Sequence, residues 1–106
     1  MKILALEVEI PGTPPEAFEP HLRPEAEAIW ALYQADVLRE IYFRQEWHGA
    51  VLILECPDAA EARRVLAELP LVRAGLITFD VIPLIPYPGL ARLFAAASDP
   101  QPRSSS

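Results

Sequence analysis

Four segments of the chain alternate between two sets of residues with a period of two, a pattern that indicates β-strands. They span residues 3–10, 38–46, 50–56 and 75–82. Helical patterns, with apolar residues three and four positions apart, lie between the first and second segments and between the third and fourth. This order of strand, helix, strand, strand, helix and strand leaves few ways to build a single sheet.

The alternation assigns each strand two faces. We expect the apolar face, which the helices cover, to carry Leu4, Leu6, Val8, Ile41, Phe43, Leu52, Leu54, Ile77, Phe79 and Val81. In the first strand, Ile3, Ala5, Glu7 and Glu9 are then expected on the opposite, helix-free face.

Capping residues and prolines set the expected helix ends. Pro20 and Pro24 predict a short turn near 14–19 and a main helix from about 24 to 36, with Thr13 and Glu16 spaced as a capping box before the turn. Asp58 and Glu61 predict the start of a second helix over residues 58–69, which Pro70 ends. A turn at 47–49 joins the second and third strands into a hairpin.

Two interleaved, right-handed βαβ units of this kind give an α+β domain of the ferredoxin-like type. It has a four-stranded antiparallel sheet in the order 4-1-3-2, with both helices on one face. We expect one domain over residues 1–97, which includes a proline-rich arm at 83–97, followed by a disordered tail at 98–106.

Composition excludes several classes of partner. The formal net charge is -6, and the longest basic run is Arg63-Arg64, so we expect binding to neither nucleic acid nor an anionic membrane. No stretch approaches the roughly 20 apolar residues of a membrane span. The single cysteine, Cys56, fits a reducing compartment, and we expect a cytoplasmic protein. Two separated histidines and four isolated glycines predict neither a metal nor a cofactor.

Apolar residues remain that no element of one chain would cover. On the helix-free face and along the arm these are Ile3, Ala5, Val51, Ile53, Leu76, Ile82, Ile85, Tyr87, Leu90, Leu93 and Phe94. The pattern predicts a homodimer, sheet against sheet, whose arms reach neighbouring copies and allow larger rings built from dimers.

The end of the second helix and the last strand carry a family resemblance. Leu69-Pro70-Leu71, then Gly75 to Val81, then Pro83-Leu84, resemble the muconolactone isomerase-like proteins of the dimeric α/β-barrel superfamily, over residues 1 to about 94. The resemblance implies a dimeric α/β barrel and an isomerase that moves a proton on a small organic acid or lactone, in a cavity whose mouth lies near the start of the first helix. No basic residue in 3–10 matches the strand arginine of the isomerase.

Ionisable residues of the helix-free face provide the candidate catalytic groups. Glu7, Tyr42, Arg44 and Asp80 are expected to line a cavity between that face and the first helix, with His21 or His48 at its mouth. A desolvated carboxylate would act as general base, Arg44 would bind a substrate carboxylate, and Tyr42 would donate to an enolate oxygen.

Simpler interpretations of the same residues remain open. In these interpretations Arg44 pairs with a carboxylate for structural reasons only, and His48 is an exposed turn residue. The chain would then be a non-catalytic ligand-binding or assembly module.

Overall fold

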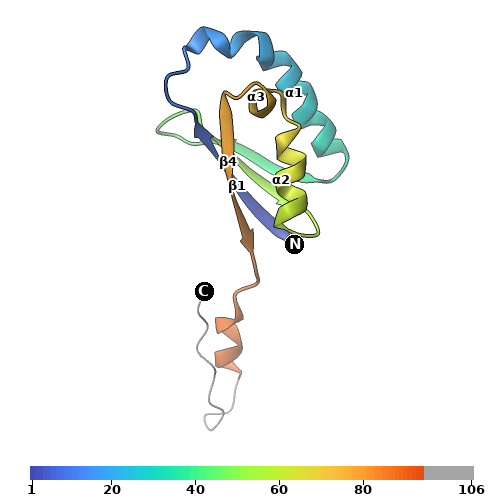
Figure 1. The fold of residues 1–106 in the computed structure, drawn as a ribbon. Helices are drawn as coiled ribbons and strands as arrows, with labels where there is room; N and C mark the ends of the chain where they lie inside the picture. The colour runs from blue at the N-terminus through green and yellow to red at the C-terminus, as the bar shows by residue number, and fades with distance from the viewer. Residues whose placement is uncertain (95–106) are drawn as a thin grey trace.

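The computed structural model describes residues 1–94, which form a four-stranded antiparallel sheet in the order β2-β3-β1-β4. The strands are β1 (Lys2–Glu9), β2 (Leu38–Phe43), β3 (Ala50–Glu55) and β4 (Ile77–Leu84). The helices α1 (Glu19–Gln34), α2 (Ala59–Ala67) and α3 (Pro70–Arg73) cover one face of the sheet (Figure 1). The α+β ferredoxin-like fold and its strand order are therefore confirmed. The predicted tail at 98–106 and residues 95–97 of the arm lie outside the described residues.

The hydrophobic core lies between the sheet and the helices. It contains Ile3, Ala5, Leu38, Ala50, Leu52, Leu54, Cys56, Ala62, Leu66 and Leu69. Strands β2, β3 and β4 turn the predicted sets toward the helices: Ile41 is paired with Leu52, and Ile77 is buried.

The prediction for the faces of β1 was wrong. Ile3 is paired with Leu54 and Ala5 with Leu52, so Ile3 and Ala5, both 0% exposed, face the helices. Leu4, Leu6 and Val8 therefore lie on the helix-free face. Both faces of β1 carry apolar side chains, so the alternation fixes the two sets but does not say which set the helices cover.

Helix α1 begins five residues earlier than expected. Pro20 lies in its first turn, where backbone N–H groups have no helical acceptor, and Pro24 is accommodated inside the helix. The predicted turn is the short 3₁₀ helix η1 (Pro15–Ala17). Its N-cap position is Pro14, and the Thr13 hydroxyl donates to the Ile10 carbonyl at 3.0 Å, so the predicted capping box does not form.

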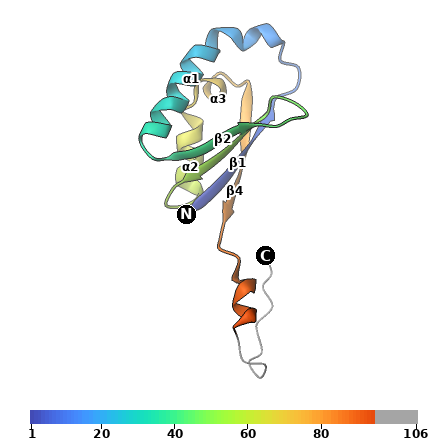
Figure 2. The ribbon, with the colours of Figure 1, turned by 180° about the vertical axis from the view of Figure 1, so that it is seen from behind.

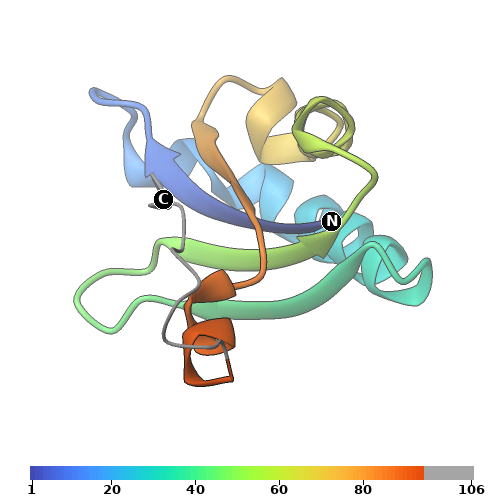
Figure 3. The ribbon, with the colours of Figure 1, turned by 90° about the horizontal axis from the view of Figure 1, so that it is seen from below.

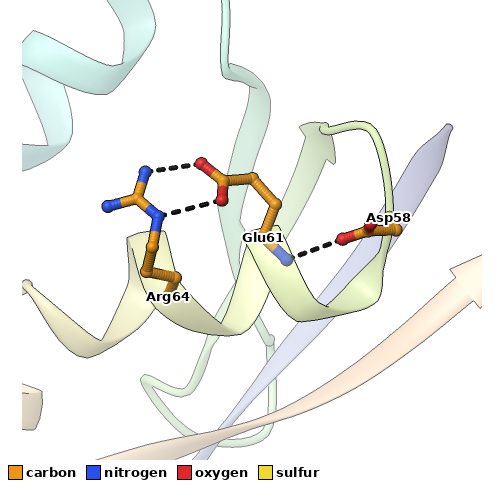
Figure 4. Close-up of polar contacts among 3 residues, drawn as sticks. All are labelled: Asp58, Glu61 and Arg64. Carbon is orange, nitrogen blue, oxygen red and sulfur yellow. Dashed lines mark hydrogen bonds and ion pairs between the residues drawn. The ribbon is translucent and has the colours of Figure 1, made fainter.

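Helix α2 begins as predicted. The Asp58 carboxylate accepts a hydrogen bond from the Glu61 backbone N–H at 2.8 Å, and Glu61 pairs with Arg64 one turn later (Figure 4). The helix ends at Ala67, and Pro70 opens α3 as its first residue. The predicted hairpin between β2 and β3 is also present, closed by a hydrogen bond from the Arg44 N–H to the Gly49 carbonyl at 2.9 Å.

The arm begins later than predicted, because Pro83 and Leu84 belong to β4. From here on, the arm means residues 85–94, which continue beyond that strand. They contain the 3₁₀ helix η2 (Pro88–Leu93) and extend away from the domain (Figures 1 and 2). Seen from below, the arm still stands apart from helices α1, α2 and α3 (Figure 3). Within residues 1–94, none of the helices is long and apolar enough to cross a membrane.

Candidate functional site

A cavity of about 550 Å³ lies between α1 and the helix-covered face of the sheet. This volume is within the usual range for small-molecule sites. The cavity is lined by Glu7, Leu22, Glu25, Ala26, Ile29, Trp30, Tyr33, Leu38, Ile41, Phe43, Ala50, Leu52, Leu71 and Phe79. All but the two glutamates are apolar or aromatic residues, so the cavity suits a small and mostly apolar ligand.

Two stacked aromatic pairs stand at the cavity. Trp30 and Tyr33, one turn apart on α1, have ring centroids 5.7 Å apart and nearly parallel planes. Phe43, at the end of β2, stacks on His48 from the hairpin turn at 5.2 Å. Trp30 is 58% exposed and Phe43 is 65% exposed, so both rings belong to the open side of the cavity. We call Leu22, Trp30, Tyr33, Ile41 and Phe43 the rim.

The first of the two cavity carboxylates is Glu7, on β1. Its Oε1 accepts a hydrogen bond from the Ala50 backbone N–H at 3.2 Å. Burial raises the pKa of the Glu7 carboxyl, and the charges of Glu9 and Glu25 raise it further, while the Ala50 hydrogen bond opposes the change. Glu7 therefore has the properties of a general base that takes up protons more readily than an exposed carboxylate does.

The second carboxylate, Glu25, comes from α1. Its Oε1 accepts from the Leu71 backbone N–H at 2.9 Å, which ties α1 to the start of α3. Burial raises the pKa of Glu25, whereas the Leu71 hydrogen bond and the charge of His21 lower it. Within residues 1–94, no lysine, arginine or histidine is among the residues that line this cavity.

The structure places the predicted site residues apart. Glu7 lies in the cavity because β1 turns the opposite way from the prediction. Tyr42 and Asp80 lie on the helix-free face, where Tyr42 is paired with Val51 and Asp80 with Leu6. A cavity between the helix-free face and α1 was therefore a wrong prediction, since the sheet itself separates the two.

The remaining candidates lie near the cavity or away from it. The Arg44 Nε donates to Glu46 at 2.8 Å, and its guanidinium lies 5.6 Å from the centre of the Trp47 ring. The Tyr42 hydroxyl donates to Glu40 at 2.7 Å. His21 lies one helical turn before Glu25, and His48 contacts the rim through Phe43. Both histidines are thus next to the site without lining it.

Glu25 was missed in the sequence, although a signal existed. It lies four residues before Ile29, so it falls on the apolar stripe that α1 turns toward the sheet. A carboxylate in such a stripe needs a hydrogen-bond donor. The N–H of Leu71 supplies it, because at the start of α3 this group has no acceptor within its own helix. In residues 1–94, no three His, Cys, Asp or Glu side chains gather as they would around a metal ion.

Comparisons with known proteins show what this chain is similar to. No protein-family model matches the chain, and no curated protein matches it. Among solved structures, muconolactone isomerase aligns with a TM-score of 0.66 at 16% identity, over 95% of this chain and all of that one. The 5-chloro-2-hydroxyhydroquinone dehydrochlorinase TftG of Burkholderia phenoliruptrix, in complex with 2,5-dihydroxybenzoquinone, aligns with a TM-score of 0.65 at 16% identity, over 80% of this chain and 94% of that one.

An antibiotic biosynthesis monooxygenase aligns with a TM-score of 0.50 at 19% identity, over 81% of this chain and all of the other. At these identities the likeness concerns the fold. The chain has the ferredoxin-like α+β fold of muconolactone isomerase and TftG, which confirms the resemblance read from the sequence.

Proposed function

We propose that this protein binds a small, uncharged ring compound in the cavity between α1 and the sheet and transfers a proton on it, as in the isomerisation of an unsaturated lactone. The observation that carries the proposal is the pair of carboxylates, Glu7 and Glu25, in an otherwise apolar cavity. Each uses one oxygen for a backbone N–H, which holds the side chain in place and leaves the other oxygen to meet a ligand.

Glu7 is the proposed base. For a lactone with its double bond between the β- and γ-carbons, the Glu7 carboxylate removes a proton from the carbon next to the carbonyl. The electron pair of that C–H bond moves into a dienolate. Return of the proton from the Glu7 carboxyl to the γ-carbon moves the double bond into conjugation with the carbonyl, with no net oxidation. General-base catalysis of this kind contributes about 10²–10⁴-fold to a rate.

The charge of the cavity favours the lactone over the organic acid. A ligand carboxylate would meet two glutamates and no cation from the same chain, and like charges repel more strongly in a largely apolar cavity than in water. Arg44, the residue expected to bind a substrate carboxylate, is engaged with Glu46 outside the cavity. The names of the two aligned proteins support the choice of ligand size, since one acts on a lactone and the other was solved with a dihydroxybenzoquinone.

The test is the isomerisation of α-angelica lactone to its conjugated isomer, followed by NMR. We expect the wild-type protein to accelerate the reaction and Glu7→Gln to lose about 100-fold or more of that acceleration. Glu9→Gln is the matched control, because Glu9 lies on the same face of β1 but does not line the cavity. A wild-type protein without activity, or a Glu7→Gln protein as active as Glu9→Gln, would contradict the proposal.

A second proposal concerns assembly. The helix-free face presents Leu4, Leu6, Val8, Val51, Ile53 and Ile82, of which Val8 and Ile82 are exposed. A contiguous apolar sheet face of this kind is a typical interface, and we propose an isologous homodimer with the two sheets face to face, as in a dimeric α/β barrel. We also propose a cytoplasmic location for the protein, because a single cysteine, Cys56, fits a reducing compartment. Light scattering coupled to size-exclusion chromatography measures the assembly, and a stable monomer at micromolar concentration would refute it.

A further inference from the structure

Besides the helix-free face of the sheet, two other apolar surfaces of the chain lack a partner among residues 1–94. One is the rim of the cavity, where Trp30, Tyr33 and Phe43 are at least half exposed. The other is the arm, in which Ile85, Tyr87, Leu90, Leu93 and Phe94 are all exposed, Leu93 to 76% and Phe94 to 87%. Exposing large apolar side chains to water to this extent costs free energy, so we expect another molecule to cover each surface.

The arm does not cover the rim of its own chain. It leaves the sheet at Leu84, which is paired with Lys2 at the start of β1, whereas Glu7 and Phe79 mark the cavity end of the same two strands. The two points are five residues apart along each strand, or about 17 Å at the rise of a β-strand. Beyond β4 the arm continues away from α1 and α3 (Figures 1 and 2).

The charge of the arm is complementary to that of the cavity. Arg92 is the only charged residue between positions 83 and 94. It takes part in none of the ion pairs of residues 1–94, and it lies between Leu90 and Leu93, which share one side of the 3₁₀ helix η2. The cavity has the complementary character, with an apolar aromatic rim and two carboxylates without a cation.

We infer that the arm of a second copy closes the cavity, with Leu90 and Leu93 on the rim and Arg92 turned toward Glu7 and Glu25. The site is then complete only in the assembly, because the partner copy supplies the cover and the cation. With one guanidinium against two carboxylates, the closed cavity keeps one net negative charge. Its preference for uncharged ligands is therefore weakened but not reversed.

The inference rests on the proposed function, since closing the cavity matters only if the cavity binds a small molecule. The coverage of the rim can nevertheless be measured without any ligand. In the full chain with Trp47→Phe, Trp30 is the single tryptophan and reports on the rim. We expect its emission to be shifted to the blue and poorly quenched by acrylamide, despite its 58% exposure in the isolated chain.

Substitutions in the arm should expose Trp30. Leu93→Asp and Arg92→Glu, at positions that the domain does not bury, are expected to raise acrylamide quenching toward that of an indole in water. Arg73→Glu is the matched charge reversal, since Arg73 makes only an exposed 4.0 Å pair with Glu68, and it should leave the quenching unchanged. Equal quenching in the parent, Leu93→Asp and Arg92→Glu proteins would overturn the inference.

A cross-link keeps the inference testable if Trp47→Phe does not fold. In a Cys56→Ser background, chains with Tyr33→Cys are mixed with chains with Leu93→Cys, then denatured and refolded together and oxidised. The inference predicts a disulfide-linked heterodimer of the two chains that forms faster than either homodimer, and absence of that preference would overturn it. Rim protection without lactone isomerisation would refute the proposed function alone, whereas isomerisation with a solvent-exposed Trp30 would refute the closure alone.

Discussion

Adjacent aspartate substitutions in β1 separate its two faces. Ala5 is 0% exposed and faces Leu52 and the helices, so Ala5→Asp places a carboxylate in the core. The effective cost of burying an unpaired ion is several kcal/mol. A domain of this size has a total stability of about 5–15 kcal/mol, so Ala5→Asp should be largely unfolded or strongly destabilised.

Leu4→Asp should act on assembly instead. Leu4 lies on the helix-free face between Ile53 and Ile82, and in an isologous dimer the change occurs twice. Full burial of a leucine side chain contributes about 1.5–3 kcal/mol, so the dimer should lose about 3–6 kcal/mol. Its dissociation constant should then rise by roughly 10²–10⁴-fold, while the monomer stays folded.

Urea unfolding followed by circular dichroism, together with light scattering, measures both effects. We expect Ala5→Asp to have lost the unfolding transition of the wild type, and Leu4→Asp to unfold cooperatively as a smaller species. A folded Ala5→Asp protein together with an unfolded Leu4→Asp protein would show that β1 turns Leu4, and not Ala5, toward the helices. A folded Leu4→Asp protein with an unchanged mass would contradict the sheet-to-sheet dimer.

Two further predictions concern charged residues. Burial raises the pKa of Glu7 above its unfolded value, so the folded state loses stability relative to the unfolded state as the pH rises through the folded pKa. Glu7→Gln keeps an acceptor for the Ala50 N–H, so urea unfolding should find it more stable than the wild type at neutral pH but not at a pH below the unfolded pKa; a stability gap that does not change with pH would contradict this. Arg44→Ala removes an exposed pair with Glu46 and should cost at most about 1 kcal/mol without changing lactone isomerisation. A loss of activity in Arg44→Ala would contradict this and show that Arg44 takes part in the reaction.

The sequence predicted the elements of this fold well because their signals are local. Asp58 and Glu61 fix the start of α2, and the alternation in β2, β3 and β4 distinguishes a strongly apolar face from a mixed one. Strand β1 has the same contrast, but it indicates the wrong face. Leu4, Leu6 and Val8 form the wholly apolar set, yet Ile3 and Ala5, which share their face with two glutamates, are the residues that the helices bury. The choice depends on how the central strand packs under the helices, which no local pattern contains.

The candidate site could be predicted only in part, again because long-range packing decides which residues meet. Glu7 was identified as a candidate catalytic residue, but the error in β1 grouped it with Tyr42 and Asp80, which lie on the other side of the sheet. Glu25 was missed because its hydrogen-bond partner, the N–H of Leu71, is 46 residues away in sequence. The apolar character of the arm could be predicted from its composition alone. Its large side chains are exposed, so packing within the domain does not decide how they are placed.

The proposed ligand of the cavity is an uncharged ring, and we expect the cavity to select against a carboxylate. Titration calorimetry of the wild-type protein with α-angelica lactone and with a lactone of the same ring that carries a carboxylate tests it most directly, and Leu52→Phe, which fills the cavity, is the control for binding at that place. We expect the neutral lactone to bind more tightly, and Leu52→Phe to abolish its binding. Equal or tighter binding of the carboxylate, or neutral binding that survives Leu52→Phe, would contradict it.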